Sequence, residues 1–491
     1  MKYLYCFLFL PLLLLSKTVD RMTIEEKVGL LFMVPAHPDH LESLFELLEN
    51  YPIKAVISKA TDCASHRQMI EKLEQWDSFF IGMDAEWGLG MRFKDGLSFP
   101  KNLTLGAIQD DGLLYDLGYV IGVQCKEMRA HINFAPVIDV NSNPQNPIIH
   151  MRSFGSDPVR VTKKARALAR GMQDAGLLAC VKHFPGHGDT DQDSHYTLPV
   201  IKHTLKEHAI DLFPFASLFD SQVDAVMTSH LSLPAYDADM PTSLSKKVIF
   251  DLIRNQYAFS GLIISDALNM KALSENYSPE MIARLAYEAG HDILLYAARA
   301  APNIERILKK DVPKAFDYLV SLFKEKKVSL ADLDERVERI MKARKGRTAS
   351  LEKKIDPLEL KKTLFKEAIT LVQNDKEYFP LKHTDFAIIN MHKDAFVLEG
   401  DPSQDIYLLL IKEVDLKDPY YGLDLEKIKE WDQEKKLVIF LFQSPYVLRI
   451  LKNLEASIVV FYENDPVMDE MVEDVARGNM PVRGVLPISI E

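Results

Sequence analysis

The sequence predicts an α/β fold in which a (β/α)8 TIM-type barrel is followed by a smaller α/β sandwich domain. Two observations predict it. Short apolar runs alternate with helical stretches through the first two thirds of the chain, and a second alternation follows a charged boundary segment. With 491 residues, of which 47% are hydrophobic, the chain is long enough to bury the cores of two or three domains.

Eight apolar runs supply the strands of the predicted barrel. They cover residues 31–35, 55–58, 79–84, 132–137, 179–183, 225–230, 262–266 and 292–296. The first run follows a predicted helix, because Thr23 is a good N-cap residue and Glu26 stands three positions further on. A doubly wound sheet is the alternative, but it would carry a glycine-rich phosphate-binding turn after an early strand, and the sequence has none there.

The domain boundary is predicted from composition. Residues 342–356, KARKGRTASLEKKID, are strongly charged and poor in large apolar side chains. We therefore expect the barrel over 18–345, a linker over 346–358 and the second domain over 359–491. The strands of that domain are predicted in the runs AITLV, FAIINM, IYLLLI, LVIFLF and ASIVVFY.

The N-terminus predicts a secretory signal. Lys2 precedes an apolar run over 3–15, which is too short to cross a bilayer but is typical of a signal peptide. We expect residues 1–17 to be removed and the protein to be exported to the periplasm or the medium, with no stable membrane insertion afterwards. A buried first helix in a cytoplasmic protein is the alternative. Cys6 lies inside the run, so a lipoprotein anchor is not indicated.

Charge and cysteine usage exclude some classes of protein. The chain has 59 Lys and Arg against 71 Asp and Glu, a net charge of −12, which argues against nucleic acid as the main partner. Cys6, Cys63, Cys125 and Cys180 are scattered without CxxC spacing. Neither a zinc site nor a dense disulfide framework is therefore indicated.

Residues 182–199, KHFPGHGDTDQDSHYTLP, carry the densest cluster of reactive side chains. They follow an apolar run, 177–181, that has the character of a buried strand. A metal site is one interpretation, because His183 and His187 stand four residues apart. That spacing puts two ligands on one face only in a helix, and Pro185 breaks a helix.

Two other interpretations explain this stretch less well than catalysis does. Asp189, Asp191 and Asp193 alternate as in a calcium loop, but the turn glycine is replaced by Ser194 and the twelfth position is Val200 rather than glutamate. A solvated polar loop is the default for an arbitrary cluster of Asp and His. It explains poorly why a Lys-His pair directly follows a buried strand.

Polar residues also end several of the predicted barrel strands. They are Asp84, Lys182 with His183, His230 and Asp266. A single one could be a satisfied buried polar group, but four equivalent strand ends indicate an active site, because such barrels carry their chemistry at the C-terminal ends of the strands. A carboxylate at that position, such as Asp266, suits a glycosidase nucleophile.

The segments KHFPGHGDT, DSHYTLP and IISDALNM resemble the signature of the β-N-acetylglucosaminidases of glycoside hydrolase family 3, the NagZ-like enzymes. The resemblance implies that Asp266 is the nucleophile and that His195 is the general acid/base, oriented by Asp193. It implies retaining hydrolysis of a terminal, non-reducing β-linked N-acetylglucosamine through a glycosyl-aspartate intermediate, without a metal or organic cofactor. The substrates would be cell-wall (peptidoglycan) fragments or chitooligosaccharides.

The same resemblance implies a set of substrate-binding residues in DAEWGLGMR, RSFG, KHFPGHG and VMTSH. They are Asp84, Arg92, Arg152, Lys182, His183 and His230. DAEWGLGMR departs from the commoner form DQEGGRV, since Trp87 and Leu89 replace smaller or polar residues. The sugar contacts made by this segment are therefore expected to differ in detail.

The resemblance extends to the second domain, down to the closing segment GVLPISI over 484–490. We expect this domain to be structural, since the barrel loop supplies the predicted acid/base. Two alternative functions remain. A β-glucosidase of the same family is disfavoured by the DSH segment, and a non-catalytic carbohydrate-binding relative is disfavoured because binding alone requires neither Asp266 nor His195.

Overall fold

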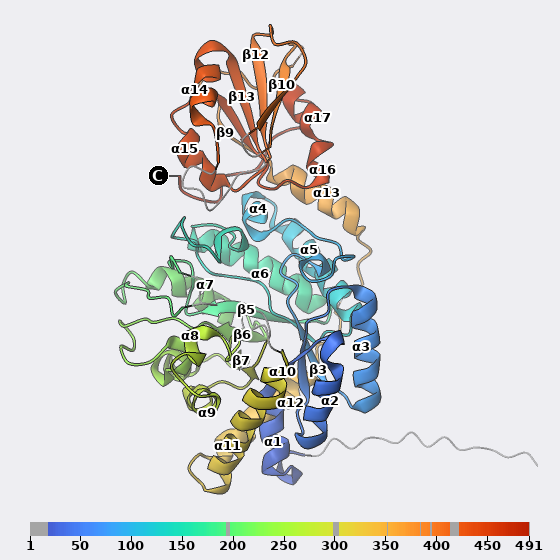
Figure 1. Cartoon of the computed structure of the whole chain (residues 1–491), viewed down its shortest axis with the longest axis vertical. Helices are drawn as coiled ribbons and strands as arrows, with labels where there is room; N and C mark the ends of the chain where they lie inside the picture. The colour runs from blue at the N-terminus through green and yellow to red at the C-terminus, as the bar shows by residue number, and fades with distance from the viewer. Residues whose placement is uncertain are drawn as a thin grey trace, which may run out of the picture.

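A computed structural model gives the arrangement of the chain as two domains stacked end to end (Figure 1). It describes residues 18–192, 197–297, 304–350, 352–382, 384–392, 395–412 and 422–490. The predicted signal peptide, 1–17, lies outside these ranges, as do Asp193 and His195. Within them, no helix is both long enough and apolar enough to span a bilayer.

The first domain is an eight-stranded parallel barrel, which confirms the predicted fold class. Its strands are β1 (Phe32–Ala36), β2 (Ala55–Ser58), β3 (Phe80–Met83), β4 (Ile132–Asn133), β5 (Leu178–Phe184), β6 (Ala225–Thr228), β7 (Leu262–Ile264) and β8 (Leu294–Leu295). Neighbours in sequence are neighbours in space, and β8 pairs with β1. A parallel bridge between Ile264 and Ile293 joins the remaining two edges. Every residue of these strands is buried, as expected where helices cover the outside of a barrel.

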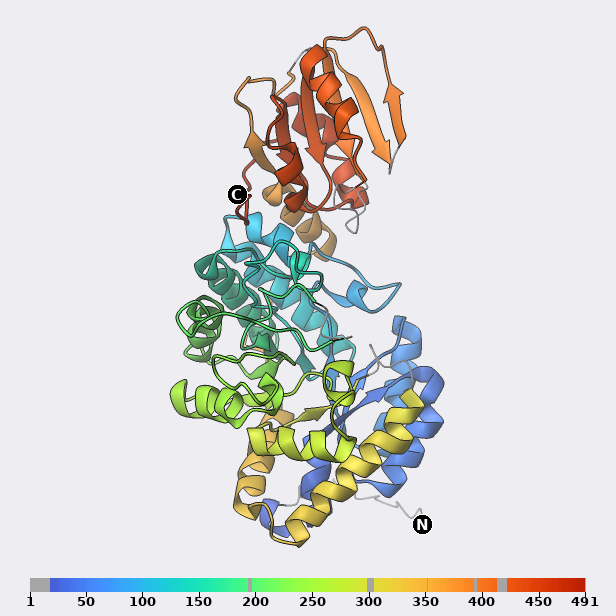
Figure 2. The same ribbon diagram turned by 60° about the vertical axis from the view of Figure 1, so that its left-hand side comes forward.

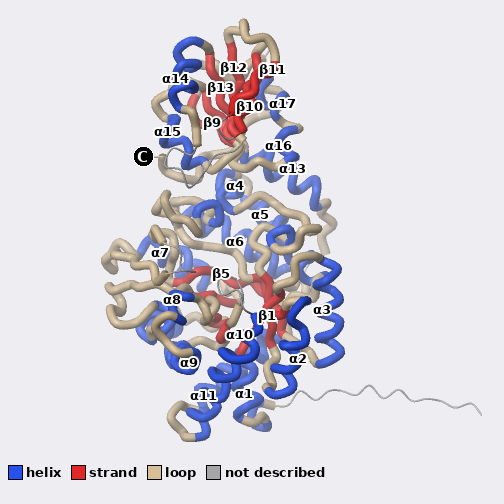
Figure 3. The backbone as a smooth tube through the Cα atoms, in the orientation of Figure 1, coloured by secondary structure: helices blue, strands red, loops and turns tan. Residues whose placement is uncertain are grey.

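Helices surround the barrel (Figure 3). They are α1 (Ile24–Leu31), α2 (Leu41–Asn50), α3 (Cys63–Trp76), α4 (Asn102–Ala107), α5 (Asp111–Glu127), α6 (Pro158–Asp174), α7 (Ala209–Phe219), α8 (Lys271–Ser274), α9 (Pro279–Ala289), α10 (Ile304–Arg306), α11 (Val312–Lys324) and α12 (Leu330–Arg344), with π-helical segments at Lys247–Gln256 and Ile307–Asp311. The predicted start of α1 is confirmed. Thr23 accepts a hydrogen bond from the Glu26 backbone N–H, and the Glu26 side chain accepts one from the Thr23 N–H.

The second domain is a six-stranded mixed sheet between helices. Its strands are β9 (Thr370–Gln373), β10 (Ala387–His392), β11 (Ala395–Glu399), β12 (Ile406–Ile411), β13 (Lys436–Leu441) and β14 (Ser457–Val460). Their order is β11-β10-β12-β13-β14-β9, with the two edge strands antiparallel to their neighbours. The sequence analysis did not predict β11. This strand lies at the edge, and its Val397 and Leu398 are exposed, so it carries no buried apolar run.

The helices of this domain cover both faces of its sheet. They are α13 (Pro357–Ala368), α14 (Leu425–Glu434), α15 (Leu448–Leu451), α16 (Pro466–Asp469) and α17 (Val472–Arg477). Leu408 packs in one apolar cluster with Val475 of α17, whereas its neighbour Leu409 packs in another with Ile428 of α14. This alternation is the two-sided burial expected of a central strand in a sandwich. The segment 346–356 connects α12 to α13, and α13 leads into the second domain beside α4 (Figure 2).

Candidate active site

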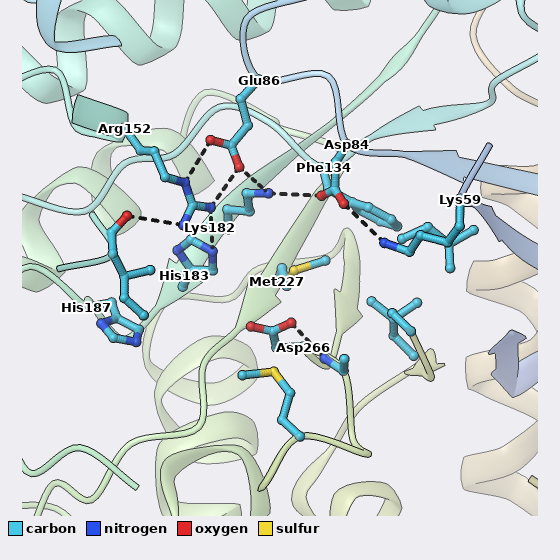
Figure 4. Close-up of a pocket in the computed structure, with 16 residues that line it drawn as sticks. Lys59, Asp84, Glu86, Phe134, Arg152, Lys182, His183, His187, Met227 and Asp266 are labelled. Atoms are coloured by element: carbon cyan, nitrogen blue, oxygen red, sulfur yellow. Dashed lines mark hydrogen bonds and ion pairs between the residues drawn. The ribbon is translucent and has the colours of Figure 1, made fainter. Parts of the chain in front are cut away.

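A pocket opens where the C-terminal ends of the barrel strands meet (Figure 4). Five residues from the predicted site line it together: Asp84 after β3, Arg152 on the loop after β4, Lys182 and His183 on β5, and Asp266 after β7. Apolar side chains complete the wall, namely those of Ile57, Phe134, Met227, Met270 and Leu295. The strand ends therefore bring together residues separated by up to 182 positions in sequence (266 − 84).

Lys182 is the centre of a buried charge network on one wall of the pocket. Its Nζ lies 3.2 Å from Asp84 Oδ1 and 2.8 Å from Glu86 Oε1. Arg92 forms an ion pair with Asp84, and Lys59 Nζ lies 3.5 Å from the same carboxylate. Burial alone would raise the pKa of Asp84, but Arg92, Lys182 and Lys59 hold it well below its ordinary value of 3.8. Asp84 is thus a fixed anion that can accept hydrogen bonds from substrate hydroxyls.

Glu86 also lines the pocket, and the sequence analysis did not include it among the site residues. Its side chain is 1% exposed, and it accepts two hydrogen bonds from Arg152, of 2.9 Å from Nε and 2.7 Å from Nη2. Burial would raise the pKa of Glu86, but Arg152 and then Lys182 lower it below 4.5. Reciprocally, burial acts to lower the pKa of Arg152 and Glu86 raises it, with a net upward shift. The pair is a planar bidentate contact that fixes the guanidinium in the pocket.

Asp139 was also missed, and it orients His183. Its Oδ2 lies 2.7 Å from His183 Nδ1, while Arg152 Nη2 lies 3.4 Å from His183 Nε2. Because a guanidinium can only donate, Nε2 is the acceptor and Nδ1–H donates to Asp139. Asp139 Oδ1 also accepts from the backbone N–H groups of His183 and His187, at 3.2 and 2.8 Å. One buried carboxylate thus anchors the start of the KHFPGH segment.

His187 lines the pocket beside Arg152, on the loop that follows β5. Its Nδ1 lies 2.9 Å from the hydroxyl of Thr190. Burial lowers the pKa of His187 to about 4, against the opposing effect of Asp139. The ring is therefore uncharged near neutral pH. In the part of the chain that the structure describes, no group of three or more His, Cys, Asp or Glu side chains is arranged to hold a metal ion.

Asp266 faces this polar wall from the opposite side, next to Met227 (Figure 4). Its backbone N–H donates to the Thr228 carbonyl at 3.1 Å, which ties the end of β7 to the end of β6. Its Oδ1 accepts from the Ala267 N–H at 2.7 Å. A carboxylate held in this way by backbone contacts can meet a ring that is bound against Asp84 and Lys182.

Two residues of the predicted binding set lie behind the pocket lining. Arg92 contacts Asp84, as described above. His230 is fully buried, with Nδ1 2.7 Å from the Ser243 hydroxyl and Nε2 3.1 Å from the Ala267 carbonyl. Both of its ring nitrogens therefore contact protein groups, and through Ala267 the ring supports the turn that carries Asp266. Substrate contact by His230 stays a prediction.

The flanks of the DSH segment are connected, although Asp193 and His195 themselves lie outside the described residues. Asp189 precedes the segment and His203 follows it, and Asp189 Oδ2 lies 2.7 Å from His203 Nε2. The other ring nitrogen lies 3.3 Å from Asp211 of α7. The nearby Asp211 carboxylate raises the pKa of His203, against the opposing effect of burial. His203 thus joins the two flanks of this segment to each other and to α7.

The chain is similar in sequence and in fold to several known proteins. The chain is 33% identical over 293 residues to "Beta-hexosaminidase A" of Pseudoalteromonas piscicida, a match that covers 54% of this chain and about half (49%) of that protein. A β-N-acetylglucosaminidase structure from Paenibacillus sp. shares the fold over 96% of this chain and 99% of its own, with a TM-score of 0.79 and 24% identity. LpqI of Mycobacterium tuberculosis matches 67% of this chain and 95% of its own, with a TM-score of 0.57 and 26% identity.

The family assignment rests on the barrel. The sequence model described as "Glycosyl hydrolase family 3 N terminal domain" matches residues 23–343, which span β1 to β8 and α1 to α11 and most of α12. That match covers more than half of the chain and includes every residue of the predicted site. The resemblance seen in KHFPGHGDT and DSHYTLP is therefore confirmed at the level of the family. The chain belongs to glycosyl hydrolase family 3.

Proposed function

We propose that the protein is a retaining exo-β-N-acetylglucosaminidase, which removes terminal non-reducing N-acetylglucosamine from cell-wall fragments or chitooligosaccharides. The observation that carries the proposal is the position of Asp266 opposite a wall formed by Asp84, Lys182, Arg152 and His183. A sugar ring has hydroxyls that both donate and accept, together with apolar C–H faces. The carboxylates, cationic donors and apolar side chains of the pocket suit both features.

The proposed reaction proceeds in two steps at the anomeric carbon. In the first, an Asp266 oxygen forms a bond to that carbon while the glycosidic C–O bond breaks, and His195 gives its proton to the departing oxygen. In the second, His195 takes a proton from water, whose oxygen attacks the same carbon and releases Asp266. Asp193 would orient the imidazole and stabilise its charged form. The names of the relatives support hexosaminidase activity, and the DSH segment supports the assignment of His195 and Asp193.

The choice of sugar is tested with two aryl glycosides. We expect kcat/KM for an aryl β-N-acetylglucosaminide to exceed that for the matching β-glucoside by about 100-fold, because the acetamido group offers contacts that the glucoside lacks. Hydrolysis rates measured by release of the aryl alcohol give the ratio. Preference for the glucoside would indicate a β-glucosidase, and binding without turnover of either compound would indicate a carbohydrate-binding protein.

The acid/base assignment is tested by His195→Ala. We expect substrates with alkyl leaving groups to lose about 10²–10⁴-fold in the glycosylation rate, whereas dinitrophenyl leaving groups, which need little protonation, lose much less. A leaving-group series measured under single-turnover conditions shows this as a steeper dependence on leaving-group pKa. His40→Ala, at a partly buried 3₁₀ turn whose residues do not line the pocket, is the control. Equal loss along the whole series in a folded variant would show that His195 is not the acid.

A further inference from the structure

The loop that carries Arg152 lies between the barrel and the second domain. It runs over 141–156, within the longer connection between β4 and α6, and its residues His150–Arg152 form one turn of 3₁₀ helix. The Arg152 side chain points into the pocket, where Glu86 and His183 contact it. The opposite side of the loop is connected to the second domain at three places, twice directly and once through α4.

Tyr446 makes the first contact. Its hydroxyl accepts a hydrogen bond from Asn141 Nδ2, and its ring lies 5.1 Å from the ring of His150, centroid to centroid. The side chain is 1% exposed and packs in an apolar cluster with Met151, which directly precedes Arg152. Next to it, the Ser444 hydroxyl lies 3.2 Å from His150 Nε2. Burial lowers the pKa of His150 to about 4, so this contact does not change its charge between about pH 5 and pH 9.

His150 has a backbone conformation that needs such support. Its φ is +31°, in the left-handed region that non-glycine residues seldom adopt. Conformations of this kind persist where surrounding contacts hold them. Here the contacts that hold the His150 side chain come from Tyr446 and Ser444 of the second domain. The strained residue stands two positions before Arg152.

The second contact reaches Arg152 through α4. Glu463, which follows β14, accepts hydrogen bonds from the Lys101 N–H at 2.8 Å and from the Thr104 hydroxyl. Asn102, between these two residues, donates from Nδ2 to the Arg152 carbonyl at 2.7 Å. The first turn of α4 is thus held by the second domain on one side and holds the backbone of Arg152 on the other.

The third contact uses the closing GVLPISI segment. The Ser156 N–H donates to the Pro487 carbonyl at 3.1 Å, and the Ser489 N–H donates to the Ser156 hydroxyl at 3.2 Å. Gly155 has φ +137°, and a Cβ at this position would lie 2.2 Å from the Pro487 oxygen. Only glycine fits there, because of both the backbone conformation and the close approach. The second domain therefore contacts both ends of the Arg152 loop, at Asn141 and at Gly155–Ser156.

We propose that the second domain positions Arg152 for the sugar, and that Tyr446 is the positioning residue through which it does so. The inference rests on the proposed function, because it assigns Arg152 to the bound sugar. Tyr446 does not reach the pocket, so it touches neither the substrate nor a reacting atom. Its effect passes through Asn141, His150 and Met151 to the guanidinium. This role differs from a purely structural one, since it predicts a change in sugar affinity.

The test uses the full chain and two matched substitutions. Tyr446→Phe removes the hydroxyl that contacts Asn141. Tyr462→Phe removes the hydroxyl of an equally buried tyrosine in the same domain, which lies 2.8 Å from the Thr370 hydroxyl. Among the described residues, no contact between Tyr462 and the Arg152 loop is found. For Tyr446→Phe we expect KM for an aryl β-N-acetylglucosaminide, and Ki for free N-acetylglucosamine, to rise about five- to tenfold, while kcat changes less than about twofold. Tyr462→Phe leaves all three unchanged.

A reciprocal substitution checks the route. Asn141→Ala should raise KM by a similar factor. The double variant with Tyr446→Phe should have a KM no higher than that of the single variant with the higher KM. Wild-type KM and Ki in Tyr446→Phe, or equal shifts in both tyrosine variants, would overturn the proposal. If the unaltered chain hydrolyses no β-N-acetylglucosaminide, the proposed function fails instead. In that case the increase in melting temperature produced by N-acetylglucosamine is measured for the unaltered chain and for the same variants, and equal increases overturn the positioning role.

Discussion

Asp266→Asn is expected to lower kcat for an aryl β-N-acetylglucosaminide by about 10⁴-fold or more while leaving the fold intact. The amide has the size of the carboxylate and can still accept from the Ala267 N–H, so the end of β7 keeps its backbone contacts. It cannot form the ester to the anomeric carbon. Steady-state rates and circular dichroism of the purified variant measure the two parts of the expectation.

Asp220→Asn is the matched control, because this exposed carboxylate at the C-terminal end of α7 is not among the residues that line the pocket. It should keep full activity. Proton NMR of the unaltered protein supplies a second check, since a covalent intermediate on Asp266 requires the β-anomer of the product to form first. Near-normal turnover in Asp266→Asn, or an α-anomer as the initial product, would exclude the assignment.

Glu86→Gln is expected to lower the free energy of unfolding by about 3–5 kcal/mol, because it leaves the buried charges of Arg152 and Lys182 without one of their anionic partners. The side chain of Glu86 is 1% exposed and that of Lys182 is 3% exposed, so solvent does little to replace the lost contact. Sugar affinity should fall as well, because Arg152 loses its bidentate partner. Urea denaturation gives the stability, and KM gives the affinity.

The pH dependence separates lost charge from lost packing. The pKa of Glu86 is lowered in the folded protein below its ordinary value of 4.5, so its charge stabilises the fold above about pH 4.5 and stabilises it less as the pH falls. The stability difference between the unaltered protein and Glu86→Gln should therefore shrink below that pH. Glu71→Gln, on the exposed face of α3, should cost under about 0.5 kcal/mol. A difference that does not vary with pH would show that packing, rather than charge, is responsible.

The sequence was sufficient for the barrel because each strand is buried on both faces and therefore appears as a continuous apolar run. Only the ends differ. The run 132–137 predicts a longer strand than β4, which ends at Asn133. The residues after Asn133 still pair with β5, since the Ala135 and Pro136 carbonyls accept from the backbone N–H groups of Cys180 and Lys182 and Val137 forms a bridge with Lys182. Pro136 has no N–H to donate, so the ladder is interrupted there. In the second domain, β11 was missed because an exposed edge strand needs no such run.

The candidate site was predictable where chemistry and strand position coincide, as at Asp84, Lys182 and Asp266. Glu86 and Asp139 were not, because each acquires its role from a partner distant in sequence. Glu86 lies 66 positions from Arg152, and Asp139 lies 44 positions from His183. Local signals did exist, since Glu86 stands in DAEWGLGMR and Asp139 follows the fourth apolar run by two residues. Neither signal distinguishes a buried ion pair from an exposed carboxylate.

The contact between Tyr446 and Asn141 also has a thermodynamic consequence. Coupling between two binding events is reciprocal, so if the docked second domain strengthens the hold of Arg152 on a sugar, the sugar strengthens the docking by the same factor. An occupied pocket would then strengthen the docking of the two domains by the same factor, about five- to tenfold, that is expected for KM. Between turnovers the interface around Tyr446 and Glu463 is therefore weaker than it is while a sugar is bound.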